Sequence, residues 1–257
     1  MQLQNHLIFK PPFLLFCFLI YIGCAKAQVS IPPKPDGFWY HNRAPNPDSV
    51  VIEAFFDPVC PDSRDSWKPL KEAIQNYGSS IALVVHTFPL PYHDNAFLAS
   101  RALHIVDKLN VSVTYHLLEA FFGQQEKFYG RATSNLTRAF VQEEIARFVV
   151  DTVGRSYSPA IFGGFRDVNS DQATRISFKY GGLRGVYGTP TFFVNGFPLP
   201  DAGSALDNNG WLRILDPLVN KQDFFFFLRE NRVPNTWLIV GALGVLEHKA
   251  TTTLPEV

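Results

Sequence analysis

One cysteine stands where a protein chain favours thiol chemistry, at the junction of a predicted strand and a predicted helix. Cys60 follows an apolar run at 49–56 and precedes Pro61, a residue type that fits the first position of a helix. The free N–H groups and the positive dipole end of a helix start favour the thiolate, which is the nucleophile. Asp57 and Asp62 oppose this effect by like charge. Because Cys60 lies between two prolines, we expect it to be accessible at the surface; a small buried core residue is the ordinary alternative.

The position of a second, resolving thiol is occupied by a serine. Ser63 stands where a two-cysteine site would place the thiol that displaces a bound partner. Its hydroxyl can hydrogen-bond the Cys60 sulfur but cannot resolve a mixed disulfide. The other two cysteines, Cys17 and Cys24, lie in a predicted N-terminal leader. Intramolecular dithiol exchange is therefore excluded for the mature chain.

Residues 1–27 have the features of a signal peptide. An apolar run of about 11 residues is shorter than the roughly 20 that span a bilayer, and Ala25-Lys26-Ala27 forms a cleavage site. An uncleaved signal anchor is the alternative. Two sequons predict glycosylation at Asn110 and Asn135. The terminal Leu-Pro-Glu-Val is not a retention signal, so we expect an extracellular location or an endomembrane lumen.

The composition favours one core and argues against an electrostatic nucleic-acid binder. The chain has 257 residues, of which 46% are hydrophobic, enough for one sizeable core. Lys and Arg together number 23, as do Asp and Glu, so no basic field exists for nucleic acid. The histidines are scattered and Cys60 has no neighbouring cysteine, so the sequence predicts no metal site.

The order of predicted elements is strand, helix, strand, a block of helices, and a hairpin with a final helix. A proline-rich segment at 28–48 is expected to be extended, and Gly78 ends a helix that begins at Pro61. Asn195-Gly196 predicts a hairpin turn. The domain is expected at 49–220 with a helical insertion at about 92–182, followed by an apolar and aromatic tail at 221–257. The helices of the middle third are predicted at 93–109, 115–122, 136–153 and 171–180. Ser134 or Asn135 is expected to cap the third of these, and Gly181-Gly182 to halt the fourth. A short last helix is predicted at about 209–219.

Three segments in this order resemble a known family. Phe56-Asp57-Pro-Val-Cys60-Pro61-Asp-Ser63 is similar to the Cys-Pro-x-Cys motif and its lead-in in bacterial periplasmic disulfide oxidoreductases of the DsbA and DsbG kind. His86 to His93 and the alanines after it resemble that family's second strand and first inserted helix, and Gly185 to Gly196 resembles its cis-proline strand and hairpin. The resemblance covers roughly residues 45 to 220.

The resemblance implies an α/β, thioredoxin-like fold with a helical insertion between the second strand and the cis-proline hairpin. It places Thr189 and a cis-Pro190 beside Cys60 as substrate-binding residues, with a groove for extended client peptide. Pro61 and Ser63 would complete the catalytic motif.

Two functions follow from these observations. The first is a monothiol oxidoreductase without a resident cofactor, which forms mixed disulfides with client proteins or with glutathione and is released by an external thiol. The second is a binding module that keeps the peptide groove for client peptides or protein partners without turnover.

Overall fold

The structure is a computed structural model that describes residues 31–200 and 204–230. The chain divides into two compact units, residues 1–36 and 37–257. Of the first unit only residues 31–36 are described, and these form no helix or strand. The predicted signal peptide and the tail beyond Glu230 lie outside the described residues.

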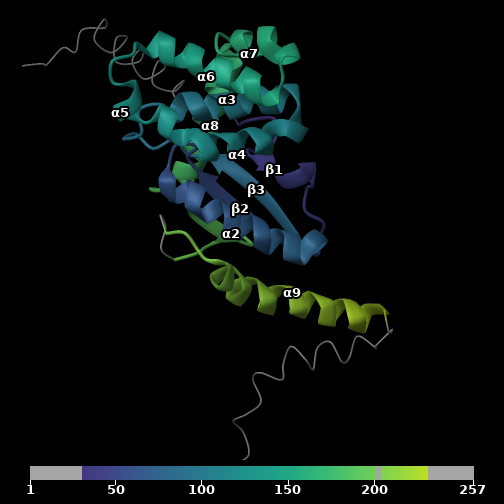
Figure 1. The fold of residues 1–257 in the computed structure, drawn as a ribbon. Helices are drawn as coiled ribbons and strands as arrows, with labels where there is room; N and C mark the ends of the chain where they lie inside the picture. The colour runs from purple at the N-terminus through teal and green to yellow at the C-terminus, as the bar shows by residue number, and fades with distance from the viewer. Residues whose placement is uncertain (1–30, 201–203, 231–257) are drawn as a thin grey trace, which may run out of the picture. The chain divides into compact units, whose positions relative to one another are not determined.

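A five-stranded sheet forms the centre of the second unit (Figure 1). Its order is β1-β3-β2-β4-β5, in which β2 and β3 run parallel and every other neighbouring pair runs antiparallel. The central pair is the longest, because both runs are rich in β-branched and apolar residues that tolerate burial. The strands are β1 (Phe38–Trp39), β2 (Val50–Phe56), β3 (Ile81–Thr87), β4 (Thr191–Val194) and β5 (Phe197–Pro198).

Helices separate the parallel pair from the antiparallel hairpin. Six of the helices in the described chain follow β3 directly, and they gather at one end of the sheet in Figure 1, while the last helix lies beyond α2. The helices are α2 (Pro61–Tyr77), α3 (Ala96–Leu109), α4 (Thr114–Gln124), α5 (Gly130–Thr133), α6 (Arg138–Val153), α7 (Ser158–Gly164), α8 (Val168–Leu183) and α9 (Asn208–Glu230).

One face of the sheet packs on α2 and α9 through aromatic rings. Successive side chains of a strand point to opposite faces, and Phe56 points toward α2, with its ring centroid 6.2 Å from that of Trp67. Phe192 of β4 lies on the same face, 5.8 Å from Phe56 and 5.0 Å from the fully buried Trp211 of α9. Both helices therefore cover the same face.

The other face packs on α8 and reaches Cys60. Phe55 stacks on Tyr180 of α8 at 6.0 Å and belongs to a buried cluster that contains the Cys60 side chain. A Cβ on Gly181 would lie 2.6 Å from a ring carbon of Phe88. The prediction that Gly181-Gly182 halts this helix was wrong, because the glycine permits close packing and α8 continues to Leu183.

Several predicted elements are confirmed. The strand at 49–56, the helix Pro61–Tyr77 and the hairpin are all present. Asn195 and Gly196 form the hairpin turn in the left-handed region, with φ of 49° and 83°. The entry segment also contributes the edge strand β1, paired antiparallel with β3.

Other helix ends also differ from the prediction. Thr137, and neither Ser134 nor Asn135, caps α6, with its hydroxyl accepting from the Phe140 amide. The helix predicted to begin at His93 begins at Ala96. Residues 91–95 form turns instead, and the His93 side chain binds Asp57. The last helix continues to Glu230, and was expected to be short.

Candidate active site

Cys60 is the N-cap of α2, and Pro61 is its first residue. The Cys60 amide donates to the Asp57 carbonyl at 3.0 Å, and the Cys60 carbonyl accepts from the Arg64 amide at 3.1 Å. The expectation of an accessible thiol was wrong, since the residue is only 2% exposed. Its side chain packs in a buried cluster with Leu90 and Val186. These residues come from loops that are distant in sequence, so the prolines near Cys60 could not indicate that they would cover it.

The loop before β4 supplies the nearest partner of the thiol. The Cys60 sulfur donates to the Thr189 carbonyl at 3.4 Å, and the Thr189–Pro190 peptide bond is cis. The structure thus brings together two sequence motifs that are 129 residues apart. The Thr189 hydroxyl is buried and, within the described part of the chain, has no hydrogen-bond partner.

Ser63 serves the turn that precedes the helix. Its buried hydroxyl accepts from the Asp57 amide at 3.3 Å, and its carbonyl accepts from the Ser66 hydroxyl at 2.9 Å. This hydroxyl does not form the hydrogen bond to the Cys60 sulfur that the sequence allows. Among described residues, the sulfur donates a hydrogen bond to the Thr189 carbonyl instead. The side chain at the second-thiol position is therefore part of the backbone scaffold.

Asp57 organises the turn between β2 and α2. Its carboxylate is fully buried and accepts the Val59 amide at 2.8 Å, the Leu90 amide at 3.0 Å and the His93 ring nitrogen Nδ1 at 2.8 Å. The sequence predicts a like charge near Cys60 and a place in the family motif for Asp57, and a helix start for His93, with a role as ligand or proton carrier as the alternative. Neither pattern predicts the contact between the two side chains. A carboxylate directly after a buried strand, in an otherwise apolar run, was the signal that it needed buried donors.

Gln125 joins the helical insertion to the cysteine turn, the segment 57–63 that links β2 to the first residues of α2 and carries Cys60. It lies in a 3₁₀ turn, Gln125–Phe128, is 1% exposed, and donates from Nε2 to the carbonyls of Pro58 at 3.3 Å and Cys60 at 3.1 Å. Its Oε1 accepts from the Tyr129 hydroxyl at 2.9 Å. No local sequence signal pointed to Gln125, because the two carbonyls that it binds lie more than sixty residues earlier in the chain.

A pocket of about 240 Å³ lies beside the cysteine. The residues on either side of Cys60, Val59 and Pro61, form one wall. The loop after β3 contributes Tyr92, and the insertion contributes Phe128 and Tyr129. The cysteine turn, the loop after β3 and the insertion therefore enclose one cavity with aromatic walls.

The tyrosines of this pocket lie close to the cysteine. Burial raises the pKa of the Tyr92 hydroxyl above its ordinary value, and negative charge on Cys60, Asp57 and Asp62 raises it further. Burial likewise raises the pKa of Tyr129, which nearby Arg64 partly offsets. Negative groups of the cysteine turn therefore act on Tyr92, while Tyr129 lies under the opposing influence of Arg64.

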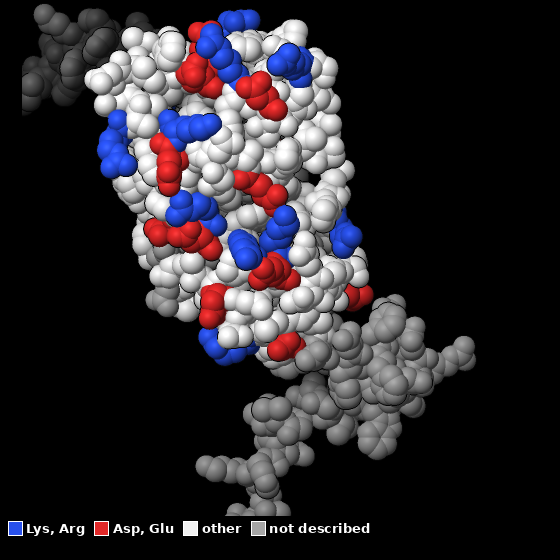
Figure 2. Space-filling model, viewed as in Figure 1, with Lys and Arg blue, Asp and Glu red and all other residues white. Residues whose placement is uncertain are grey.

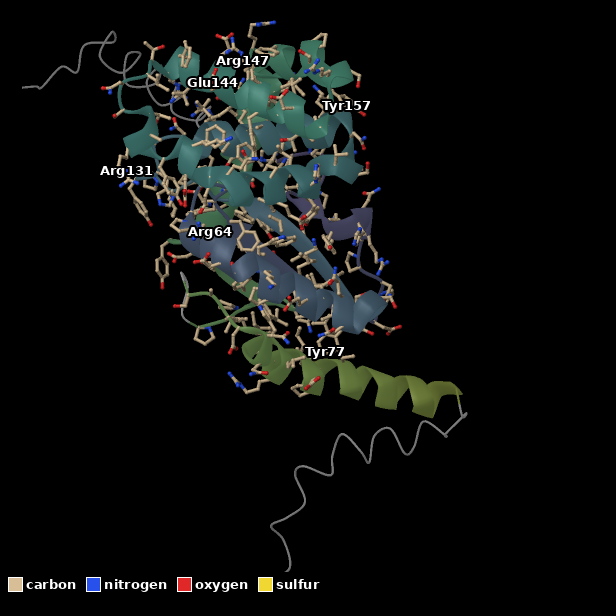
Figure 3. The ribbon with its side chains drawn as sticks, viewed as in Figure 1. Arg64, Tyr77, Arg131, Glu144, Arg147 and Tyr157 are labelled. Atoms are coloured by element: carbon tan, nitrogen blue, oxygen red, sulfur yellow. The ribbon has the colours of Figure 1, made fainter. Side chains whose placement is uncertain are left out.

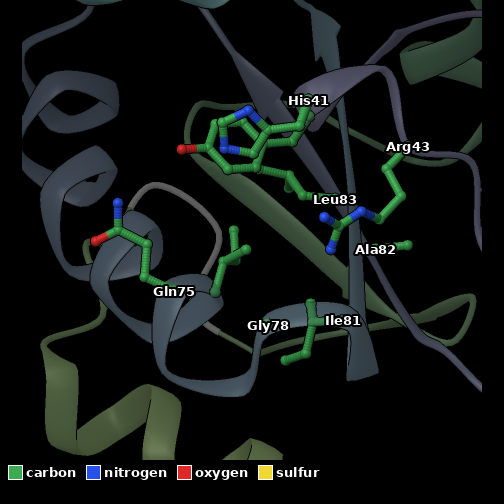
Figure 4. Close-up of a pocket in the computed structure, with 9 residues that line it drawn as sticks. His41, Arg43, Gln75, Gly78, Ile81, Ala82 and Leu83 are labelled. Carbon is green, nitrogen blue, oxygen red and sulfur yellow. The ribbon is translucent and has the colours of Figure 1, made fainter.

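A second pocket, of about 190 Å³, lies between the first residues of β3, the end of α2 and the turn after β1 (Figure 4). His41, Arg43 and Gln75 line it. None of the site residues predicted from the sequence lines this pocket.

The two predicted glycosylation sites lie on the insertion in different environments. Asn110 follows α3 and is partly buried, with its amide nitrogen donating to the Tyr157 hydroxyl at 3.2 Å. Asn135 is exposed in the turn before α6. Over residues 31–200 and 204–230 the structure shows no cluster of three or more metal-binding side chains. In those same ranges no helix has both the length and the apolarity to cross a membrane.

Comparison with solved structures identifies the fold. The thiol-disulfide exchange protein α-DsbA2 from Wolbachia pipientis superimposes with a TM-score of 0.55 at 17% identity, covering 71% of this chain and 87% of that one. A variant of α-DsbA1 from Wolbachia pipientis, in which two cysteines are replaced by alanine, gives 0.55 at 14% identity, covering 76% and 96%. A thioredoxin-like oxidoreductase from Silicibacter pomeroyi gives 0.52 at 17% identity, covering 73% and 92%.

The chain has a DsbA-like thioredoxin fold. In this thioredoxin-like fold the helical insertion lies between β3 and β4, as the sequence predicts. No protein-family model matches the sequence, and no curated protein matches it. At these identities the likeness concerns the fold, and the chemistry must be argued from the site.

Proposed function

We propose that the protein is a monothiol member of the thiol-disulfide exchange proteins, which forms mixed disulfides with clients through Cys60. One observation carries the proposal: the Cys60 sulfur lies at the N-terminus of α2 and against the Thr189 carbonyl. A helix N-terminus stabilises the thiolate, and the backbone of the loop at Thr189 can pair with an extended client.

The exchange conserves atoms and electrons. The Cys60 thiol loses its proton to solvent, and the thiolate attacks one sulfur of a client disulfide. The new sulfur–sulfur bond forms as the old one breaks, and the second client sulfur leaves as a thiolate. Ser63 offers no thiol to resolve the mixed disulfide, so an external thiol such as glutathione releases the client.

The Thr189 hydroxyl supports the proposal that a client chain binds beside it. A buried hydroxyl without a partner costs about 1–3 kcal/mol, and among described residues this hydroxyl has none. A client backbone lying along Thr189 and Pro190 would supply an acceptor, and would enter where Cys60 is now covered.

We further propose that this chemistry takes place in the secretory pathway. The leader at 1–27 and glycans on Asn110 and Asn135 are the sequence features that support this location. Expression in a secreting eukaryotic cell should give a chain that begins near Gln28 and loses two glycans on enzymatic deglycosylation. A chain that keeps its leader or carries no glycan would refute this part.

The test of the exchange function uses the secreted chain, in which Cys60 is the sole thiol. A peptide carrying a mixed disulfide with thionitrobenzoate should form a covalent adduct under native conditions, seen as the peptide mass on the non-reduced protein. Cys60→Ser should form none. Ser79→Ala removes an exposed hydroxyl just after the C-terminal end of α2, far along the chain from Cys60, so it should form the adduct and serves as the matched control.

The burial of Cys60 favours the second function, a binding module on the same fold. A thiol that reacts only after denaturant is added would exclude the exchange reaction and leave the binding module. In that case Cys60→Ser should keep every peptide that the native chain binds, because no bond to sulfur would be needed.

A further inference from the structure

We propose that the pocket beside Cys60 receives the basic side chain, lysine or arginine, of a client peptide, one or two residues from the client cysteine. This inference rests on the proposed exchange function and specifies its substrate. The pocket, of about 240 Å³, is lined by the two residues that flank Cys60. A client sulfur bonded to Cys60 therefore places its neighbouring side chains at the mouth of this pocket.

The walls of the pocket suit a cation with an aliphatic stem. Tyr92, Phe128 and Tyr129 contribute aromatic rings, and Val59 and Pro61 contribute apolar surface. The faces of aromatic rings attract ammonium and guanidinium groups, and the stems of lysine and arginine bury against apolar surface. Tyr92 is 69% exposed, so its ring is available to a ligand.

Asp94 adds a carboxylate to this aromatic wall. It lines the pocket, and among the described residues no hydrogen bond or ion pair engages it. Its carboxylate lies against Gly130, where a Cβ would take its place. The adjacent His93 points its Nδ1 at the buried Asp57, so Asp57 does not reach the pocket as a free carboxylate. Asp94 is thus the acceptor that a ligand cation can use.

The charges around the pocket leave Asp94 uncompensated. His93 also lines the pocket, but its Nδ1 is held by the buried Asp57. The guanidinium of Arg64 is bound to Asp65 at 2.8 Å, and the exposed Arg131 lies on the same side of the view in Figure 3. Neither arginine lines the pocket. The raised pKa of Tyr92 also reports a negative surrounding, after the effect of burial. On the face shown in Figure 2 acidic and basic side chains are interspersed. The preference for a basic client side chain therefore comes from the pocket itself and not from the overall charge of this face.

The same chemistry disfavours glutathione as the first partner. Glutathione carries two carboxylates and one ammonium group, so its net charge is negative and has the same sign as that of Asp94. A client with a basic residue beside its cysteine meets the opposite charge and an aromatic wall.

The experiment compares three peptides that differ at one residue next to a single cysteine: lysine, leucine or glutamate. Each carries its cysteine as a mixed disulfide with thionitrobenzoate. The Cys60 thiolate attacks the peptide sulfur, thionitrobenzoate leaves as a coloured thiolate, and the Cys60 proton passes to the buffer. The rate constant at low salt should be about tenfold higher for lysine than for glutamate, the size expected for an exposed ion pair with a cation–π contact.

Two variants separate the pocket from general surface charge. Asp94→Asn should reduce the lysine-to-glutamate ratio to below about threefold. Asp151→Asn, which removes an exposed carboxylate on α6, should leave the ratio unchanged. Equal rates for the three peptides, or a preference that survives Asp94→Asn, would overturn the inference and leave the exchange function standing. Failure of all three peptides to react would overturn the exchange function, and the inference with it.

Discussion

The buried carboxylate of Asp57 gives a prediction whose size follows from its partners. Substitution by alanine removes the acceptor of two buried amides, those of Val59 and Leu90, and the partner of His93. Substitution by asparagine keeps one oxygen. It can accept one of the two amides, but its own N–H₂ group then faces the other.

The two substitutions should therefore differ in cost. A buried N–H without an acceptor costs about 1–3 kcal/mol, so alanine at Asp57 loses about 2–6 kcal/mol from its two orphaned amides. Relief of burying a carboxylate returns part of that amount. We expect a net loss of about 3 kcal/mol for Asp57→Ala and about half of that for Asp57→Asn, which orphans one amide.

The assay is equilibrium unfolding in urea at neutral pH, with Asp62→Asn as the matched control. Asp62 is also an aspartate of the cysteine turn, but it is exposed in the first turn of α2. Its neutralisation should cost less than about 1 kcal/mol through the helix dipole. The reasoning is refuted if Asp57→Ala costs no more than Asp62→Asn, or if asparagine and alanine at Asp57 cost the same.

Three further predictions concern packing and titration. Gly181→Ala should lower the free energy of unfolding by about 1–3 kcal/mol, because its Cβ meets an aromatic ring. Gly182→Ala, in open space on the same helix, should be neutral or stabilising, and urea unfolding of the two variants tests the difference. Trp211→Ala should cost about 3–5 kcal/mol, because this fully buried ring holds α9 on the sheet; calorimetry showing less than about 1 kcal/mol would contradict it. Burial and the hydrogen bond to Asp216 raise the pKa of Tyr77 to about 12 from 10.0, so the folded state keeps this proton longer than the unfolded state. The stability of the native chain relative to Tyr77→Phe should hold below pH 10 and fall as pH rises toward 12; a constant difference in unfolding free energy over that range would contradict it.

The elements that the sequence predicted well have local causes. The strand before Cys60 is a continuous β-branched and aromatic run, the helix after it begins at Pro61, and the hairpin turns at Asn195-Gly196. In each case the residues that specify the element lie within it. The order of the elements also followed from these patterns, and the resemblance to DsbA-like proteins added the thioredoxin-like fold, which the comparison with solved structures confirms.

The burial of Cys60 could not be predicted in the same way. Two neighbouring prolines suggested exposure, but the cover comes from Leu90 and Val186, which are distant in sequence. The partners of Asp57 are missed for the same reason, since His93 lies 36 residues further on. Local patterns specify backbone conformation, while burial is decided by which distant segments the fold brings together.

The contacts of the cysteine turn also explain why the insertion matters to the thiol. Gln125 and His93, from segments after β3, bind the two ends of this turn, at the Cys60 carbonyl and at Asp57. The turn's carbonyls and buried carboxylate would lack these partners if the insertion moved away. Because Ser63 is also committed to the turn, through the Asp57 amide, the cysteine turn is held from both sides. We therefore expect the reactivity of the Cys60 thiol to depend on the folded insertion. Gln125→Ala should change the rate at which this thiol is alkylated, although Gln125 binds the Cys60 carbonyl and not its sulfur.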